Sequence, residues 1–196
     1  GHEVVGFDVG YFKDSNIADC FTNYERFDCD LRNIEKKHLD GIDAVIHLAG
    51  LSNDPLGELA PNITQIINHD ATLKFANLAK STGVERFVYA SSQSMYGVSD
   101  TDDELDEYTS KKNPVTAYAT VKWTAEQELN KLNDDSFTVV SFRPSTVFGI
   151  SPRLRTDIVF NNLVACAYTT GNIEIKSDGS PWRPIVHVQD VCQAFL

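Results

Sequence analysis

Short runs of apolar and β-branched residues alternate with longer segments whose apolar residues repeat at helical spacing along this chain of 196 residues. Such alternation is typical of strand–helix units built around a parallel sheet. The sequence therefore predicts an α/β fold. Several of the expected strands carry apolar residues on both faces, which predicts burial on both sides of the sheet. The expected strands cover residues 3–9, 24–29, 44–49, 86–91, 138–142, 173–176 and 185–187.

Three helices are expected between these strands, over residues 61–82, 114–132 and 157–170. Pro61 opens the first and Gly83 ends it, while Gly171 closes the third. Apolar residues that recur about every four positions should form the buried face of each helix. In the first helix these residues are Ile63, Ile67, Ala71 and Phe75. In the second they are Val121, Ala125, Leu129 and Leu132.

The composition is that of a globular protein, with 42% hydrophobic and 23% charged residues. A formal net charge of −11 disfavours binding to nucleic acid. No apolar run reaches the roughly 18 to 20 residues that span a bilayer, so we expect a soluble, cytoplasmic protein. The cysteines form no CxxC pair, which indicates neither a metal site nor a disulfide framework. They are Cys20, Cys29, Cys166 and Cys192.

The spacing of Tyr118 and Lys122 places a phenol and an ammonium group one helical turn apart. A lysine in this position lowers the pKa of the phenol and so favours a tyrosinate that can accept a proton. The alternative is a packed tyrosine beside a solvated lysine. Upstream, the strand over residues 86–91 runs into Ser91, Ser92 and Ser94, at the strand end where open α/β sheets bind ligands. Turn capping is the structural alternative for these serines.

Five blocks in order resemble extended short-chain dehydrogenases/reductases of the NAD-dependent epimerase/dehydratase group, which act on nucleotide sugars. They cover residues 43–50, 91–97, 118–122, 143–144 and 183–190. The resemblance implies a Rossmann-like, doubly wound parallel sheet that lacks its first strand–helix unit and most of the substrate domain. Residues 1–150 would form a partial NAD-binding domain, and residues 151–196 would begin the substrate-binding portion. No G-x-G-x-x-G motif is present, so we expect the chain alone to bind NAD weakly.

The same resemblance assigns a catalytic set. Tyr118 would exchange a proton with a sugar hydroxyl, and the Ser92 hydroxyl would hold the same oxygen. Lys122 would bind the nicotinamide ribose and depress the pKa of Tyr118. The cofactor would be NAD, which takes up and returns the hydride.

Further residues are assigned to the cofactor by resemblance. Asp8 would bind the adenine ribose, and NAD would be preferred over NADP, because Asp8 would meet a 2′-phosphate with like charge and no arginine is expected beside it to compensate. Caps, a tight turn and a satisfied core amide are the structural alternatives for residues of this group. The full cofactor group is Asp8, Asp30, Leu31, Leu48, Ala49, Gly50, Asn68, Tyr118, Lys122 and Pro144.

On the substrate side, Arg183 would grip the diphosphate of a nucleotide sugar and Asn162 would contact the same group. Helix capping would explain neither residue. Residues 52–55 are expected to form a loop, either over the sugar or as a surface turn. The helices over residues 61–82 and 115–132 resemble a dimerisation pair, so a homodimer is expected.

The residues after Ser92 bear on the type of reaction. Dehydratases of this group carry an Asp-Glu pair there, whereas this chain has Gln93 and Ser94, which cannot act as carboxylate bases. A dehydratase is therefore disfavoured. We expect an NAD-dependent nucleotide-sugar epimerase that works through a transient 4-keto sugar. The alternatives are a 4-keto reductase or dehydrogenase of the same family, or a cofactor-binding or inactive fragment without turnover.

Overall fold

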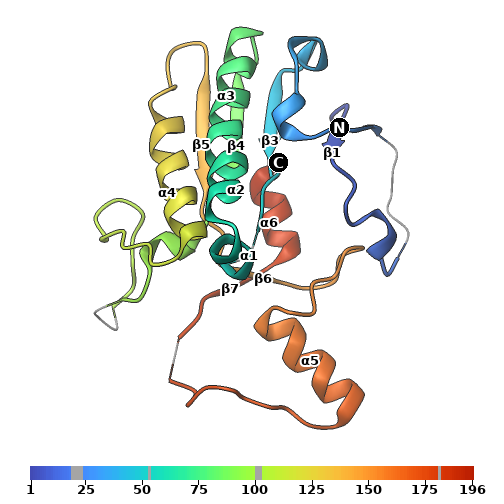
Figure 1. Cartoon of the computed structure of the whole chain (residues 1–196), viewed down its shortest axis with the longest axis vertical. Helices are drawn as coiled ribbons and strands as arrows, with labels where there is room; N and C mark the ends of the chain where they lie inside the picture. Colours follow the sequence, from blue (N-terminus) through green and yellow to red (C-terminus); the bar gives the residue numbers. More distant parts are fainter. Residues whose placement is uncertain (19–23, 53, 100–102, 181) are drawn as a thin grey trace. The chain divides into compact units, whose positions relative to one another are not determined.

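The computed structural model describes residues 1–18, 24–52, 54–99, 103–180 and 182–196 (Figure 1). Cys20 and Asn53 of the expected loop over residues 52–55 lie outside this part. The chain forms two compact units. One unit, which we call the sheet unit, contains residues 5–9 and 26–143. The other, the C-terminal unit, contains residues 144–196 with residues 1–4 and 10–25.

A three-stranded parallel sheet forms the centre of the sheet unit. Its strands are β3 (Ala44–His47), β4 (Arg86–Ala90) and β5 (Thr138–Phe142), in that order. The register sets His47 beside Tyr89 and Tyr89 beside Ser141. Paired residues of parallel strands point to the same face, so these three side chains share one side of the sheet.

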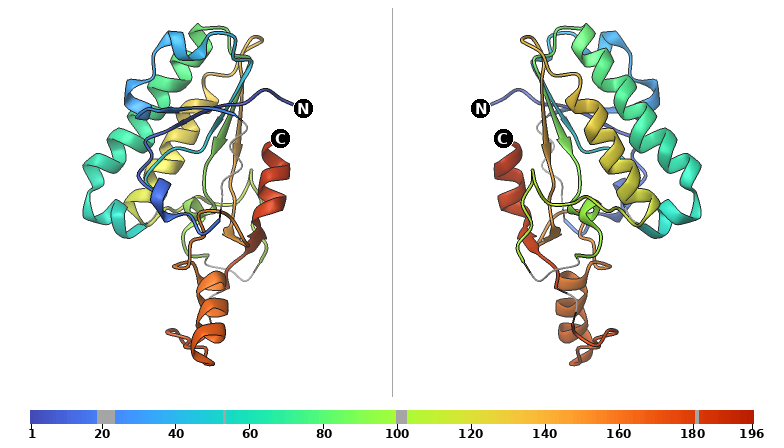
Figure 2. Two further views of the ribbon diagram at one scale, coloured as in Figure 1. Left: turned by 90° about the vertical axis from the view of Figure 1, so that its right-hand side faces the viewer. Right: turned by 90° about the vertical axis from the view of Figure 1, so that its left-hand side faces the viewer.

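Two helices cover that side: α3 (Thr72–Ser81) and α4 (Ala117–Asn130) pack together on it (Figure 2). The core between them is apolar, and its largest members are Phe75, Phe87, Tyr89, Leu129 and Phe137. Ile46 and Val140 point to the other side and are 43% and 42% exposed. The expectation that these strands are buried on both faces was therefore wrong, because helices of this unit cover one face only.

The expected helix over residues 61–82 forms as three consecutive segments. They are α2 (Pro61–Gln65), a π-helical segment η4 (Ile66–Ala71) and α3. The predicted buried stripe was wrong in the first half, where Ile63 is 50% exposed while Thr64 and Asn68 are buried. A π-helical turn holds one more residue than an α-helical turn, so a regular four-residue spacing does not stay on one face. The stripe on α4 was confirmed at Val121, Ala125 and Leu129.

The remaining elements of the sheet unit are short. Strand β1 (Val5–Asp8) pairs with β2 (Glu25–Asp28) in a separate two-stranded sheet, and no strand pairing joins β1 to β3 among the described residues. Helix α1 (Asp54–Leu59) precedes α2. Short 3₁₀ turns are η2 (Leu31–Asn33), η3 (Lys36–Leu39) and η5 (Gln93–Tyr96).

The C-terminal unit holds a second parallel pair, β6 (Thr146–Phe148) with β7 (Ile185–His187). Its helices are α5 (Val159–Thr170), which ends at Gly171 as predicted, and α6 (Val188–Phe195), and a 3₁₀ turn η1 (Lys13–Ser15) belongs to it. Strand β6 was not predicted. Residues 173–176 were predicted as a strand, which was wrong: they are exposed and join no ladder. Among the described residues, no helix combines the length and apolarity needed to cross a membrane.

Candidate active site

Helix α4 presents three ionisable side chains in line. Tyr118, Lys122 and Glu126 are spaced by one turn each, so they share one face of the helix. Lys122 is 5% exposed and Glu126 is 2% exposed. Residues with such side chains are rarely buried to this degree unless they are paired, so this helix face is specialised.

Lys122 is held between the end of strand β4 and the phenol of Tyr118. Its Nζ donates a hydrogen bond to the Ala90 carbonyl over 2.8 Å. The same atom lies 4.8 Å from the ring centroid of Tyr89 and 6.0 Å from that of Tyr118. Burial lowers the pKa of Lys122 to about 8. The alternative of a solvated lysine was therefore wrong.

Ser92 caps the start of the turn η5, which contacts α4. Its Oγ accepts hydrogen bonds from the Ser94 backbone N–H over 3.2 Å and from the Ser94 hydroxyl over 2.8 Å. Turn capping, the structural alternative, is thus present. A hydroxyl has two acceptor sites and one proton, so these two bonds leave the proton of Ser92 to be donated. Capping and donation to a ligand are compatible at this residue.

Helix α1 holds the start of α4, a feature that sequence reasoning missed. The Asp54 carboxylate accepts a hydrogen bond from the Thr116 hydroxyl over 2.6 Å, and Glu58 accepts one from the Ala117 N–H over 2.8 Å. A Cβ added to Gly57 would lie 3.3 Å from the backbone N of Tyr118. The expectation of a loop over residues 52–55 was wrong at its end, because α1 begins at Asp54. These contacts join positions about sixty residues apart, so no local sequence pattern announces them.

Asn68 fixes the turn after β3 by two hydrogen bonds. The side-chain Oδ1 of Asn68 accepts a hydrogen bond from the Leu51 N–H and its Nδ2 donates one to the Leu51 carbonyl, both over 2.8 Å. A Cβ on Gly50 would lie 2.9 Å from that Oδ1, so only glycine fits without a shift. Leu48, Ala49 and Gly50 are exposed at this strand end. Asn68 therefore acts as both a satisfied core amide and a support for the turn.

His47 is a second buried polar group that sequence reasoning missed. It is 3% exposed, and its Nε2 lies 2.8 Å from the Thr72 hydroxyl. Burial and the nearby charge of Lys122 lower the pKa of His47 to about 3. His47 is therefore neutral at physiological pH and links β3 to α3 beneath the strand ends.

Asp8, at the end of β1, and Asp30, after β2, both have partners. Arg26 on β2 lies 3.9 Å from the Asp8 carboxylate, so the expectation that no arginine stands beside Asp8 was wrong. The pairing of β1 with β2 brings the two together. Asp30 caps η2 and binds the Arg32 guanidinium over 2.7 Å and 2.9 Å, and these hydrogen bonds lower the pKa of Asp30. Leu31 packs against the core.

Three predicted site residues belong to the C-terminal unit: Pro144, Asn162 and Arg183. Arg183 is exposed just before β7. The Asn162 side chain donates a hydrogen bond to the Thr156 carbonyl over 3.0 Å, and the neighbouring Asn161 bonds to Arg155 in the same way. Both amides tie the start of α5 to the segment before it. A local structural role for Asn162, which the sequence argued against, is therefore observed.

The chain is similar to enzymes that act on nucleotide sugars. It is 30% identical over 159 residues to a mouse dTDP-D-glucose 4,6-dehydratase, a match that covers 81% of this chain and 44% of that protein. It is 28% identical to an uncharacterized UDP-glucose epimerase of Bacillus subtilis, covering 78% of this chain and 47% of that protein. The chain thus spans about half the length of these curated relatives.

Solved structures give the same fold. The structure of MoeE5 in complex with UDP-glucose and NAD superposes with a TM-score of 0.75 at 26% identity, covering 99% of this chain and 70% of that one. This likeness confirms the α/β, Rossmann-like fold class. The sequence model described as the NAD dependent epimerase/dehydratase family matches residues 1–196. The chain belongs to this NAD-dependent family.

Proposed function

We propose that the protein is an NAD-dependent nucleotide-sugar epimerase that works through a transient 4-keto sugar. The observation that carries this proposal is the buried Lys122, fixed to the end of β4 beside the Tyr118 phenol. Burying a lysine whose hydrogen-bond partner is a single carbonyl costs free energy of folding. The charge of this lysine favours the phenolate form of the adjacent tyrosine. A module that only binds a cofactor has no need of this arrangement.

Each residue of the set has one task. The Tyr118 phenolate accepts the proton of a sugar hydroxyl and later returns it. Ser92 donates its remaining proton to the same oxygen, which places that oxygen for the transfer. Lys122 holds the phenolate in place by charge. NAD, when bound, supplies the acceptor and donor of the hydride.

The residues around the strand ends fit a dinucleotide. The exposed Gly50 lets a ligand approach the backbone where a side chain would collide with Asn68. Asp8 would hold the adenine ribose and Lys122 the nicotinamide ribose. Arg183 and Asn162 would serve the diphosphate of the substrate. The Asp30 carboxylate already binds the Arg32 guanidinium. Asp30 would therefore contact the adenine through other atoms of its turn.

The surroundings of Ser92 support epimerisation over loss of water. The neighbour that touches Ser92 is the neutral hydroxyl of Ser94. The carboxylates of Asp54 and Glu58 are bonded to the start of α4. In the dehydratases of the family that this chain resembles, the acid and base for elimination stand at the positions that Gln93 and Ser94 occupy here.

The test is turnover of UDP-glucose and dTDP-glucose in the full-length protein, with products identified by NMR. Tyr118→Phe should lower kcat by about a thousandfold, because one hydroxyl is lost while the ring still packs. Tyr108→Phe is the matched control, since Tyr108 is 92% exposed, and it should keep full turnover. Formation of a 4-keto-6-deoxy product, or a Tyr118→Phe enzyme within tenfold of wild type, would contradict the proposal.

A homodimer through the helices over residues 61–82 and 115–132 is part of the same proposal. Ile63 and Ile66 are 50% and 46% exposed on the helix that carries Asn68, and they form apolar surface that a partner would cover. Ile63→Glu should convert a dimer into a monomer in sedimentation experiments. A wild-type protein that sediments as a monomer at micromolar concentration would refute this part.

A further inference from the structure

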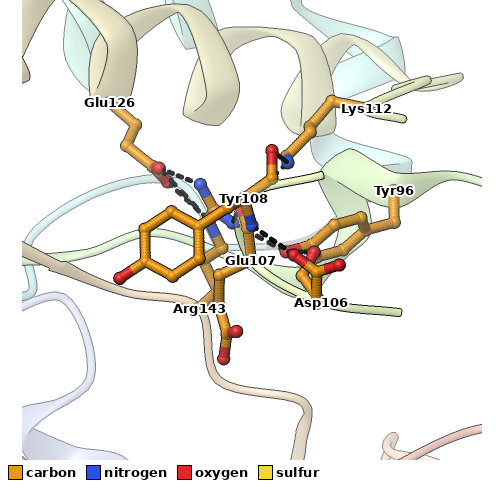
Figure 3. Close-up of polar contacts among 7 residues, drawn as sticks. All are labelled: Tyr96, Asp106, Glu107, Tyr108, Lys112, Glu126 and Arg143. Carbon is orange, nitrogen blue, oxygen red and sulfur yellow. Dashed lines mark hydrogen bonds and ion pairs between the residues drawn. The ribbon is translucent and has the colours of Figure 1, made fainter. Parts of the chain in front are cut away.

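A buried ion pair lies one turn beyond Lys122 on the catalytic helix (Figure 3). The Glu126 carboxylate accepts hydrogen bonds from Arg143 Nη2 over 2.6 Å and from Nε over 3.1 Å. Glu126 is 2% exposed and the Arg143 side chain is 16% exposed. Both of these bonds end on Oε1, and Nε also donates to Oε2 over 3.3 Å, so two nitrogens of the guanidinium hold both oxygens of the carboxylate.

The third nitrogen of the same guanidinium binds the turn and loop that follow Ser92. Arg143 Nη1 donates to the Tyr96 hydroxyl over 2.7 Å and to the Glu107 carbonyl over 2.9 Å (Figure 3). Tyr96 is the last residue of η5, which begins after Ser92. The guanidinium also lies 5.6 Å from the Trp123 ring on α4. Arg143 therefore joins the catalytic helix to the turn that carries Ser92.

The charges beneath the catalytic helix do not cancel. Below about pH 8, where Lys122 is protonated, Lys122 and Arg143 are cations and Glu126 is an anion, so this buried set carries one net positive charge. His47 and Tyr89, which face the set from β3 and β4, are neutral because burial lowers the pKa of His47 to about 3 and raises that of Tyr89. A phenolate at Tyr118 would bring the set to neutrality.

Other charged groups around the helix are bonded elsewhere. Asp54 and Glu58 of α1 bind the start of α4. Lys112 donates to the Glu107 carbonyl over 2.8 Å, and His69 of η4 lies between Asp70 and Glu128. These groups are unchanged in every variant used below. They make the same contribution to the phenol pKa of Tyr118 in each variant, so the differences in this pKa between variants do not depend on them.

We propose that Glu126 and Arg143 are positioning residues for proton transfer at Tyr118: Arg143 cancels the charge of Glu126, so that the positive charge of Lys122 remains to stabilise the phenolate. The proposal rests on the proposed role of Tyr118. Glu126 lies two turns from Tyr118, about 12 Å along the helix axis. At this distance and an effective dielectric constant of about 20, one unit charge shifts a pKa by about one pH unit.

The experiment titrates the phenol of Tyr118 by NMR in the chain labelled with ¹³Cζ-tyrosine, without cofactor or substrate. The Tyr118→Phe variant identifies the resonance. Glu126→Gln keeps a hydrogen-bonding group and raises the net charge of the set to two, so the phenol pKa should fall by about half to one unit. Arg143→Met brings the net charge to zero, so the phenol pKa should rise by a similar amount.

Two further variants separate charge from structure. The double variant Glu126→Gln/Arg143→Met restores one net charge and should return the phenol pKa to the wild-type value. Tyr96→Phe removes one hydrogen bond to Arg143 without changing charge and should leave that pKa unchanged. A structural role alone would shift both single variants in the same direction.

The proposal is overturned if Glu126→Gln leaves the phenol pKa unchanged or raises it. Should Arg143→Met fail to fold because Glu126 is left buried without a cation, Glu126→Gln and the double variant decide the question. The titration measures only the phenol, whereas the test of the proposed function measures turnover. A failure of one is therefore distinguishable from a failure of the other.

Discussion

The interface between the sheet and helices α3 and α4 has two halves that are equally buried and chemically different. Near the start of the strands it is apolar, with Phe87 and Phe137 at 0% and 1% exposure. Near the carboxyl ends of the strands it holds His47, Lys122 and Glu126, at 3%, 5% and 2% exposure. Apolar burial stabilises the fold by removing surface from water, whereas buried charge costs free energy unless it is paired. The contrast separates the half that stabilises the fold from the half that holds the groups of the proposed proton transfer.

The largest effect is expected in the apolar half. Phe87→Ala should lower the free energy of unfolding by about 4 kcal/mol, because a fully buried ring that contacts Phe75 and Phe137 is replaced by a cavity. Urea unfolding measures this loss. The pH dependence of stability should stay as in wild type, and a changed dependence would show that the two halves are coupled.

The next effect tests the polar half through His47. The folded protein holds this histidine neutral with a pKa of about 3, whereas its ordinary value is 6.5. The unfolded chain therefore binds a proton that the folded chain rejects. The resulting stability is complete above about pH 6.5 and is lost as the pH falls toward about 3.

Between pH 7 and pH 4 this linkage should cost wild type about 3 kcal/mol that a His47→Gln variant does not lose. Unfolding by urea at both pH values gives the difference. His2→Gln is the control, because His2 is exposed, and it should behave as wild type. Equal acid sensitivity in wild type and His47→Gln would contradict the buried neutral state.

The smallest effect has the opposite sign. Lys122→Met should raise the free energy of unfolding at pH 7 by about 1 kcal/mol, because removal of a buried ammonium outweighs the lost bond to the Ala90 carbonyl. The folded pKa of Lys122 is about 8 against an ordinary 10.5, so wild type should recover the difference as the pH rises from 8 to 10.5. Lys131→Met, at an exposed position, should leave stability unchanged. A Lys122→Met protein less stable than wild type would show that the lysine supports the fold.

The sequence predicted the apolar half better than the polar half. Alternation and helical spacing located β3, β4, β5 and α4 because those patterns follow from local geometry. The motif around Tyr118 and Lys122 indicated the site for the same reason. The π-helical segment and the caps from α1 escaped prediction because they depend on contacts between distant residues.

Polar partners were the least predictable feature. Tertiary pairing brings Arg26 beside Asp8 and Arg143 beside Glu126. The spacing of these residues along the chain predicts neither contact. The stripe through Ile63 failed because a regular helix was assumed where the backbone adds a residue to a turn. Such irregularities occur often at functional sites, where a side chain must face a specific group.

Because of the π-helical segment, the number of residues between Pro61 and Ser81 determines whether Asn68 faces Leu51. Deletion of one residue within Ile66–Ala71 would allow a continuous α-helix, which is the commoner and locally more regular structure. Residues before the deletion would then turn by about 100° relative to α3, and Asn68 would no longer face Leu51. Relatives that keep this turn are therefore expected to exchange residues freely on the exposed side of the segment and to admit neither insertions nor deletions within it.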